Sequence, residues 1–285
     1  MKDDRTVPPG VLETRLRPYV DRVDLALSNE LNLYAHSRFH DPLAYSVAGG
    51  KRVRPVMLML CAEALGKTDD SVLGGAVAVE FLHTESIIHD DVIDEEVSRR
   101  SKTPFHIKYG YSASLLSADF VFAIILSIAA RYDDRRIAEE VSSAALQMAE
   151  GEYSELTIDP KSYRLTWDEY LRIVADKTAA LFETSTKLGA LIAGGSEKEV
   201  AALAKYGKSV GVAYQLRDDL LDWRSHDKVS VGLLKSYSES EVVGKMTALA
   251  QTYAEEAKRQ LLALQRNGAT ELLKDLADFT VERKR

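Results

Sequence analysis

The 285-residue chain has a single cysteine, Cys61, so it cannot form an internal disulfide or a metal site built from several thiolates. It also lacks an excess of basic residues, because 37 Lys and Arg stand against 44 Asp and Glu. That balance excludes broad nucleic-acid binding, which requires a basic surface. The N-terminal residues contain no apolar signal core, and the longest apolar stretch, 120–130, is shorter than the roughly 20 residues that span a membrane. We expect a soluble cytoplasmic protein without a membrane span.

Proline is also scarce, with seven residues in all and none after Pro160. Because proline is strongly disfavoured inside helices, such stretches permit long helices. Apolar residues recur in steps of three and four within 72–88, 171–192 and 203–216, and none of these stretches alternates strictly. No Asn-Gly or Asp-Gly turn lies between short β-branched runs, which is the usual hairpin signal. We predict an all-α chain with one domain over residues 1–285.

The motif D-D-apolar-apolar-D occurs twice, beginning at Asp90 and at Asp218. Residues four apart share a helix face, so Asp90 projects with Asp94 and Asp218 with Asp222. Apolar residues flank both copies, so the carboxylates are costly to bury unless cations compensate them. Mg²⁺ prefers such oxygen ligands and completes its shell with phosphate oxygens and water. A solvated acidic face explains either copy alone, but two copies in apolar surroundings favour a magnesium and phosphate site.

Two basic groups accompany the aspartates. Residues 49–55, G-G-K-R-V-R-P, place three positive charges behind a glycine pair, and Arg99-Arg100 follow Asp94, near the predicted end of the same helix. Arginine offers a planar fork to phosphate oxygens and lysine a movable point charge. Each group alone is equally typical of a basic surface, and no Walker A loop occurs.

One histidine, His83, lies two helical turns before Asp90 on the same predicted face. A lone helical histidine is more often a core residue than a ligand. With Glu80 it also forms the E-x-x-H pattern of di-iron bundles, but those require a second copy, which the sequence lacks.

Five motifs in order resemble those of trans-prenyl diphosphate synthases, the family that makes farnesyl, geranylgeranyl and longer polyprenyl diphosphates. Residues 49–55 resemble its G-G-K-R-x-R-P, and 83–94 its first aspartate-rich motif with the upstream histidine, followed by the paired arginines 99–100. Residues 177–178 resemble its K-T, and 214–222 its second motif, F-Q-x-x-D-D-x-x-D. The resemblance covers most of the chain. It implies an isoprenoid-synthase bundle of long helices around a central cavity, usually as a homodimer.

The resemblance also implies a reaction, in which isopentenyl diphosphate condenses with an allylic diphosphate by Mg²⁺-assisted ionisation and 1'-4 chain elongation. Three Mg²⁺ ions would bridge the allylic diphosphate to Asp90, Asp94 and Asp218, supported by Asp91, Asp219 and Asp222. Further charge on the allylic diphosphate would come from Arg99 and Lys177. Isopentenyl diphosphate would be bound by Lys51, Arg54, His83 and Arg100. The oxygen ends of Thr178 and Gln215 would face the carbocation.

The sequence departs from the family after the second motif. The family's G-K-P-x-G-x-D-L-x-x-G-K-x-T becomes W-R-S-H-D-K-V-S-V-G-L-L-K at 223–235, where Lys228 is the candidate replacement for a substrate-binding lysine. Product length in the family depends on side chains before the first motif, which here are Phe81, Leu82, Glu85 and Ser86. Glu85 would pair with a group such as a buried arginine, lie at a dimer interface or cap a short cavity. We expect a C15 or C20 product.

Two alternatives fit parts of this pattern. A terpene cyclase of the same fold keeps one aspartate-rich motif but replaces the second, and it needs no pocket for a second diphosphate. A non-catalytic or regulatory subunit of a heteromeric synthase typically loses aspartates. Neither change is present in this sequence, so both alternatives rank below a synthase.

Overall fold

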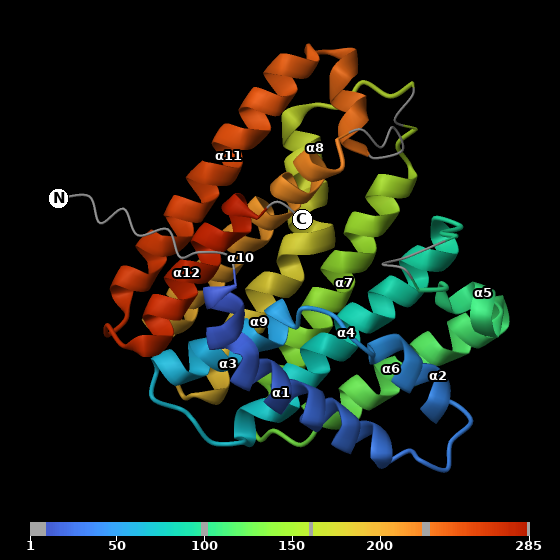
Figure 1. Cartoon of the computed structure of the whole chain (residues 1–285), viewed down its shortest axis with the longest axis vertical. Helices are drawn as coiled ribbons and strands as arrows, with labels where there is room; N and C mark the ends of the chain where they lie inside the picture. Colours follow the sequence, from blue (N-terminus) through green and yellow to red (C-terminus); the bar gives the residue numbers. More distant parts are fainter. Residues whose placement is uncertain (1–9, 98–101, 160–161, 224–228, 284–285) are drawn as a thin grey trace.

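The computed structural model of the chain describes residues 10–97, 102–159, 162–223 and 229–283, which contain helices and no β-strand (Figure 1). In chain order the helices are α1 (Val11–Asn32), α2 (His40–Val47), α3 (Val53–Ala64), α4 (Ser71–Ile93), α5 (Phe105–Tyr109), α6 (Tyr111–Ala129), α7 (Arg136–Leu156), α8 (Trp167–Ile173), the π-helix η1 (Val174–Ala179), α9 (Ala180–Ile192), α10 (Glu197–Leu221), the 3-10 helix η2 (Val229–Lys235), α11 (Glu239–Gln260), the 3-10 helix η3 (Leu261–Ala263) and α12 (Gly268–Glu282). The predicted all-α class is therefore confirmed.

Local sequence signals begin several of these helices. Thr166, Ser196 and Ser238 each start a helix with a capping box, in which the hydroxyl and a glutamate three residues later exchange hydrogen bonds with the backbone. The loops at 48–50, 66–70 and 193–196 each contain glycine, which is unfavourable inside a helix. The helix of the first aspartate motif was expected to continue towards Arg99-Arg100, but it ends at Ile93.

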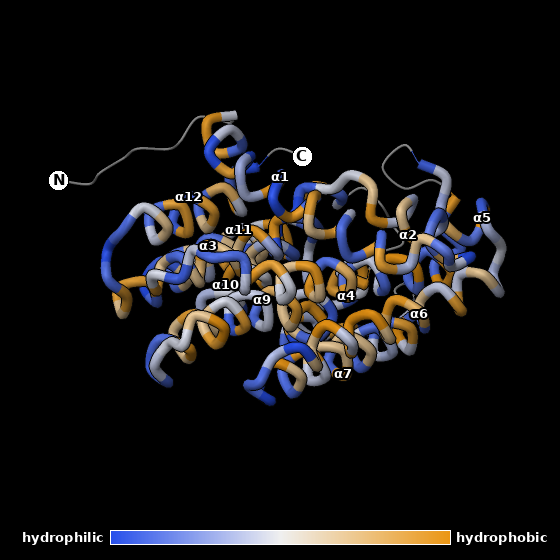
Figure 2. The backbone as a smooth tube through the Cα atoms, turned by 90° about the horizontal axis from the view of Figure 1, so that it is seen from below, coloured by the Kyte–Doolittle hydropathy of each residue, from blue (hydrophilic) through white to orange (hydrophobic). Residues whose placement is uncertain are grey.

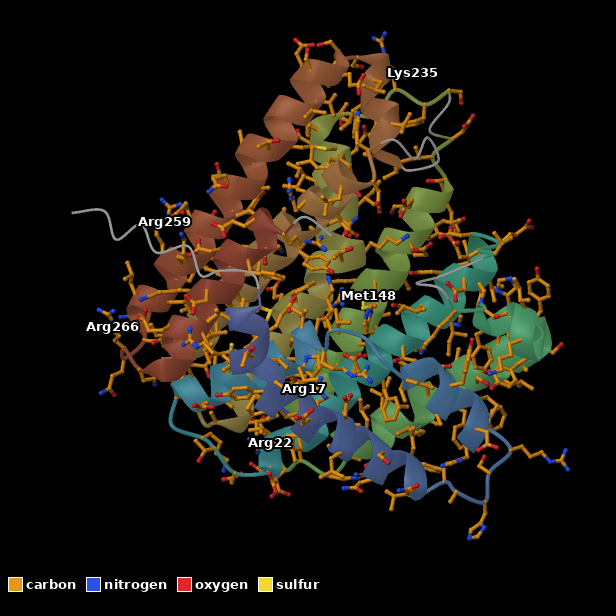
Figure 3. The ribbon with its side chains drawn as sticks, in the orientation of Figure 1. Arg17, Arg22, Met148, Lys235, Arg259 and Arg266 are labelled. Atoms are coloured by element: carbon orange, nitrogen blue, oxygen red, sulfur yellow. The ribbon has the colours of Figure 1, made fainter. Side chains whose placement is uncertain are left out.

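Two large hydrophobic cores lie side by side, and a small third cluster, Ile88, Phe105 and Ala118, joins α4, α5 and α6. The larger is built around α3, α4 and α9, with α1, α6, α7, α10 and α12 packed over them. The smaller joins α8, η1, α10, η2 and α11. In Figure 3, Met148 of α7 lies in the middle of the molecule, whereas Arg259 and Arg266 lie at its outer edge. The two cores meet along η1 and α10, the segments that carry Lys177-Thr178 and the second aspartate motif.

Two helices, α4 and α6, are long and apolar enough to cross a membrane by length and composition alone. Buried core helices meet the same criterion, and 61% of the apolar window of α4 is buried inside the protein. Figure 2 shows α6 as a largely apolar segment at the edge of the molecule. Only 44% of the apolar window of α6 is buried, so a large part of its apolar surface is exposed.

Candidate active site

A cavity of about 1010 Å³ opens where the two cores meet. Eleven of the residues proposed from the sequence line it: Lys51, Arg54, His83, Asp90, Asp94, Lys177, Thr178, Gln215, Asp218, Asp219 and Asp222. Asp91 instead lines a smaller cavity of about 230 Å³ on the side of α4 that faces α2 and α5. Arg99, Arg100 and Lys228 lie outside the described residues. Motifs up to about 170 residues apart in the sequence thus share one cavity.

The two aspartate motifs end their helices in the same way. Asp94 is the C-cap of α4 and its backbone N–H donates to Asp90 O at 2.8 Å, while Asp222 caps α10 and donates to Asp218 O at 3.0 Å. A helix C-terminus carries partial negative charge, so carboxylates there raise the free energy of the folded chain unless cations are near. Asp90 and Asp94 of the first motif and all three aspartates of the second line the cavity. This donor set therefore suits divalent cations.

A basic helix N-terminus lies at the same cavity. The glycine pair Gly49 and Gly50 has φ values of 80° and 102°, which side-chain-bearing residues rarely adopt, and this turn leads into α3. Lys51 and Arg54 follow at the helix start and line the cavity. Backbone N–H groups at a helix start and two cations are a combination that can receive an anion.

The remaining cation of that motif, Arg52, is buried and joins α3 to α1 and α4, a role that the sequence did not indicate. Its side chain is 5% exposed and donates to Glu80 of α4 at 2.6 Å, to Asp24 of α1 at 2.8 Å and to Val47 O. Its φ of 51° is uncommon for a non-glycine residue, and these contacts hold it. Glu80 is thus the partner of Arg52, so a di-iron site is not needed to account for this buried glutamate.

Aromatic rings connect two arginines along the cavity wall. The Arg54 guanidinium lies 4.4 Å from the ring centre of Phe182, which packs at 5.3 Å on Tyr214. On the far side, the Arg283 guanidinium lies 3.9 Å from the Tyr214 ring and donates to Asp218 Oδ1 at 2.9 Å. This stack of two aromatic rings between two guanidinium groups therefore links the basic end of α3 to the second aspartate motif. Arg283 follows α12, and no local motif around it in the sequence signalled this position.

Lys177 lies between the acidic groups of the site. Its ammonium contacts Glu152 and Glu155 of α7, each at 2.6 Å. Burial alone lowers the pKa of Lys177, but the carboxylates of Glu155, Asp90 and Glu152 outweigh it and raise the pKa above its ordinary value. Lys177 is therefore charged at neutral pH and stands beside the first aspartate motif.

The approach of α7 to Lys177 depends on one glycine. A Cβ atom added to Gly151 would lie 2.4 Å from the backbone N of Lys177, which is closer than such atoms pack. Lys177 itself belongs to η1, a π-helical turn within the continuous run from α8 to α9. Turns of this kind occur frequently at functional sites.

A chain of hydrogen bonds crosses from η1 to α10 and back to α8. Thr178 Oγ1 donates to Gln215 Oε1 at 2.9 Å, and Gln215 Nε2 donates to Asp219 Oδ1 at 2.8 Å. Tyr170 of α8 donates its hydroxyl to Asp219 Oδ2 at 2.5 Å. Tyr170 and Asp219 are both buried. Tyr170 was not predicted from the sequence.

None of the residues proposed to set product length is among the described residues that line the large cavity. Phe81 and Leu82 are fully buried in the larger core. Glu85 accepts from His89 Nδ1 at 3.1 Å, so it pairs with a histidine on its own helix rather than with a buried arginine. The influence of these positions on product length stays a prediction.

Comparisons with known proteins agree with this geometry. A family model described as polyprenyl synthetase matches residues 36–278. The chain belongs to the polyprenyl synthetase family. It is 32% identical over 240 residues to a short chain isoprenyl diphosphate synthase of Methanothermobacter thermautotrophicus, covering 81% of this chain and 73% of that one.

Solved structures give the same result for the fold of this polyprenyl synthetase. A decaprenyl diphosphate synthase from Rhodobacter capsulatus superimposes with a TM-score of 0.86 and 27% identity over 98% of this chain and 100% of that one. A polyprenyl synthase from Caulobacter crescentus, solved with calcium and isoprenyl diphosphate, gives 0.84 and 28% over 96% and 98%. The predicted family, isoprenoid-synthase fold and transferase class are confirmed. The roles of single residues are not tested by these similarities.

Proposed function

We propose that this polyprenyl synthetase elongates an allylic diphosphate with isopentenyl diphosphate, and that the proposed site residues other than Asp219 act as the sequence predicts. The observation that carries the proposal is the arrangement of charge in the cavity. Two helices end in D-D-x-x-D, and a third begins beside Lys51 and Arg54. Aspartates of both motifs and these two cations line one cavity. One part of the cavity thus suits a diphosphate held through metal ions, and another suits a diphosphate held by the protein's own cations.

The aspartate side would hold Mg²⁺ through Asp90, Asp94 and Asp218. Diphosphate oxygens and water would complete the shells of these ions. We propose three ions per site. When bound, Mg²⁺ neutralises charge on the diphosphate leaving group. Lys177 adds a fixed positive charge beside Asp90.

The basic side would hold isopentenyl diphosphate through Lys51, Arg54 and His83. The stacking of Arg54 on Phe182 fixes the direction of its guanidinium before the ligand arrives. Between the two diphosphates, Thr178 and Gln215 place polar oxygens beside the apolar wall formed by Ile173 and Val174. Such a wall excludes water that would otherwise quench an allylic cation.

The product would be a C15 or C20 prenyl diphosphate made by a single cytoplasmic domain. Similarity does not select the length, since the relatives include a short chain synthase and a decaprenyl synthase. The buried, lone thiol of Cys61 supports a reducing compartment.

We also propose a homodimer formed through α6 and α7. Large apolar side chains stand 51–68% exposed on these neighbouring helices: Tyr111, Leu115, Leu116, Leu126, Leu146, Tyr153 and Leu156. Apolar patches of this kind mark interfaces more often than free surface. Light scattering behind size exclusion should give about twice 31.6 kDa for the wild type and a smaller mass for Leu116→Glu.

The reaction is tested with labelled isopentenyl diphosphate, Mg²⁺ and dimethylallyl, geranyl or farnesyl diphosphate in separate reactions. We expect the label in a prenyl alcohol after phosphatase treatment, with its chain length read by chromatography. Folded protein that incorporates no label with any primer contradicts the proposal and favours a regulatory subunit. Cyclic hydrocarbon formed from the allylic substrate alone favours a cyclase.

A further inference from the structure

The chain of hydrogen bonds that ends at Tyr170 carries an inference beyond the proposed roles, although it rests on the proposed function. We infer that Tyr170 and Asp219 form a positioning pair that fixes the orientation of the Gln215 amide, so that the oxygen atoms of Gln215 and Thr178, and not their hydrogens, are presented to the cation. In this assignment Asp219 acts through Gln215, whereas its neighbour Asp218 acts at the metal.

The Gln215 amide can face Asp219 with only one of its two ends. Both oxygens of Asp219 serve as acceptors, one for the Tyr170 hydroxyl and the other for Gln215 Nε2 at 2.8 Å, so the nitrogen end of the amide is the end that faces Asp219. The amide oxygen then points away from Asp219 and meets the Thr178 hydroxyl at 2.9 Å. The network itself therefore fixes an orientation that an isolated glutamine would leave open.

The Thr178 hydroxyl is oriented by the same amide. Its proton is committed to Gln215 Oε1, so the hydroxyl presents oxygen lone pairs to any further partner in the cavity. The Thr178 hydroxyl proton and one Gln215 amide proton are thus directed along the chain towards Asp219. The oxygen ends are left on the side where positive charge develops, and dipoles fixed in advance stabilise such charge without reorganisation.

Tyr170 keeps Asp219 in place. Its hydroxyl is fully buried and occupies the second carboxylate oxygen, so the two oxygens of Asp219 accept from two different helices. Burial, with Asp219 beside it, raises the pKa of Tyr170 well above its ordinary value. The tyrosine therefore stays a donor at any pH at which the enzyme is assayed.

The adjacent aspartate has different surroundings. The Asp218 side chain is 38% exposed and accepts from Arg283 at 2.9 Å, whereas Asp219 is 4% exposed. The partly exposed Asp218 lines the cavity, where a cation can approach it, whereas both oxygens of the buried Asp219 already accept hydrogen bonds. The two neighbours in the motif are therefore suited to separate tasks.

The test compares two ligands of equal chain length, each titrated calorimetrically with Mg²⁺ present. One is an allylic diphosphate analogue with a protonated amine in place of the cationic carbon. The other is a neutral thiolodiphosphate that cannot ionise. Asp219→Asn allows the amide of Gln215 to reverse, because the new side chain can also donate in the place where Asp219 only accepts. We expect this variant to bind the ammonium analogue about 10- to 100-fold more weakly and the neutral analogue unchanged.

Tyr170→Phe keeps the packing and removes one donor, so we expect about 3- to 10-fold weaker binding of the ammonium analogue. Thr178→Ser should behave as the wild type, and Thr178→Val should not. The matched control is Tyr206→Phe, which removes another fully buried tyrosine hydroxyl, one that donates to Leu273 O at 2.7 Å away from the cavity. It should leave both affinities unchanged.

Three results would overturn the inference: equal weakening of both analogues, a raised Mg²⁺ requirement in Asp219→Asn, or no change with either analogue in Tyr170→Phe. The first two would make Asp219 part of the metal and diphosphate machinery. Wild-type protein that binds neither analogue would contradict the proposed function itself, which is a separate outcome from selective failure of the variants.

Discussion

The two aspartate motifs are nearly the same in sequence and in local geometry, yet the rest of the chain treats them differently. Each ends its helix at the last aspartate, and each buries its middle aspartate, with Asp91 at 3% and Asp219 at 4% exposure. Asp219 lines the large cavity and accepts from Tyr170 and Gln215, whereas Asp91 lines the smaller cavity, which adjoins the large one along Glu80 and His83 of α4. The motif determines where each helix ends, and the residues packed around it determine what the middle aspartate contacts.

The supports of the two helices differ as well. The α4 helix is braced by the buried ion pair of Arg52 and Glu80, about three turns before Asp90. The α10 helix is braced by Tyr170 and by Arg283, which reaches Asp218 from the segment after α12. Removing one partner of a buried ion pair costs more folding free energy than removing one hydrogen bond, so substitutions near α4 and near α10 should differ in their effect on stability.

The largest effect on turnover is expected from removing the first aspartate of either motif. Asp90→Ala and Asp218→Ala should each lower kcat by about 10³-fold or more, because metal-assisted ionisation loses several kcal/mol of stabilisation. Steady-state kinetics over a range of Mg²⁺ concentrations measure this. The matched control is Asp133→Ala, an exposed loop aspartate, which should leave kcat unchanged. Near-normal turnover in either site variant would remove that aspartate from the metal site.

The next effect concerns the brace of α4. Glu80→Ala should lower the free energy of unfolding by about 3 kcal/mol, because the buried Arg52 keeps the Val47 carbonyl but only one carboxylate, Asp24, as partners. Denaturant unfolding gives the value. The double variant Arg52→Leu/Glu80→Leu should recover most of the loss, since apolar residues replace a buried pair at little cost. A double variant as unstable as the single one would show that the ion pair is not the source.

Much of this site was predictable because it is carried by local patterns. The pair Asp90 and Asp94, its copy at Asp218 and Asp222, and the turn before Lys51 each follow from residue type and spacing. They all reach one cavity because long helices bring their ends together. The helical class of α4 and α10 was also predicted correctly, since their apolar spacing is carried within each helix.

The contacts that orient the site were not predictable in this way. Arg52 stands inside a recognised motif, but its pairing with Glu80 depends on how α3 packs on α4. Arg283 reaches Asp218 across 65 residues, and the sequence near either residue contains no sign of the other. The turn between α6 and α7 was also missed, because 130–135 contains neither glycine nor proline. Tertiary packing decides all three.

Lys177 lies between the two motifs and depends on the approach of α7, which a methyl group would prevent. Gly151→Ala should lower the free energy of unfolding by about 2 kcal/mol, because the new Cβ meets the backbone of Lys177 and Asp176 rather than a flexible side chain. Gly244→Ala in α11 is the control, since nothing lies within 4 Å of its Cβ. That variant should gain about 0.5–1 kcal/mol from helix propensity. Thermal unfolding of both variants should therefore move in opposite directions, and parallel shifts would show that α7 does not pack this closely.

A smaller effect is expected at the second motif alone. Arg283 occupies Asp218 Oδ1 as a cation, so it competes with a metal ion for that oxygen. Arg283→Ala should tighten Mn²⁺ binding to the substrate-free protein by about fivefold, which corresponds to about 1 kcal/mol for a partly exposed pair. Calorimetry measures it without turnover. Arg217→Ala, which removes a nearby arginine that donates to Arg283 O rather than to a carboxylate, is the comparison. Equal tightening in both variants would point to general loss of positive charge rather than to competition at Asp218.

The smallest effect on rate is expected at Glu85 on α4. Its carboxylate is paired with His89 one turn nearer the first motif, and its side chain is 17% exposed. Glu85→Ala removes this group from the helix that would border the growing prenyl chain, so the distribution of product lengths should change while kcat changes less than about twofold. Chromatography of the dephosphorylated products reads both quantities in one assay. Gln147→Ala, an exposed substitution on α7, should leave the distribution as it is. If Glu85→Ala yields the same products as the wild type, the chain grows along another wall, and the length-setting residues have to be sought on helices other than α4.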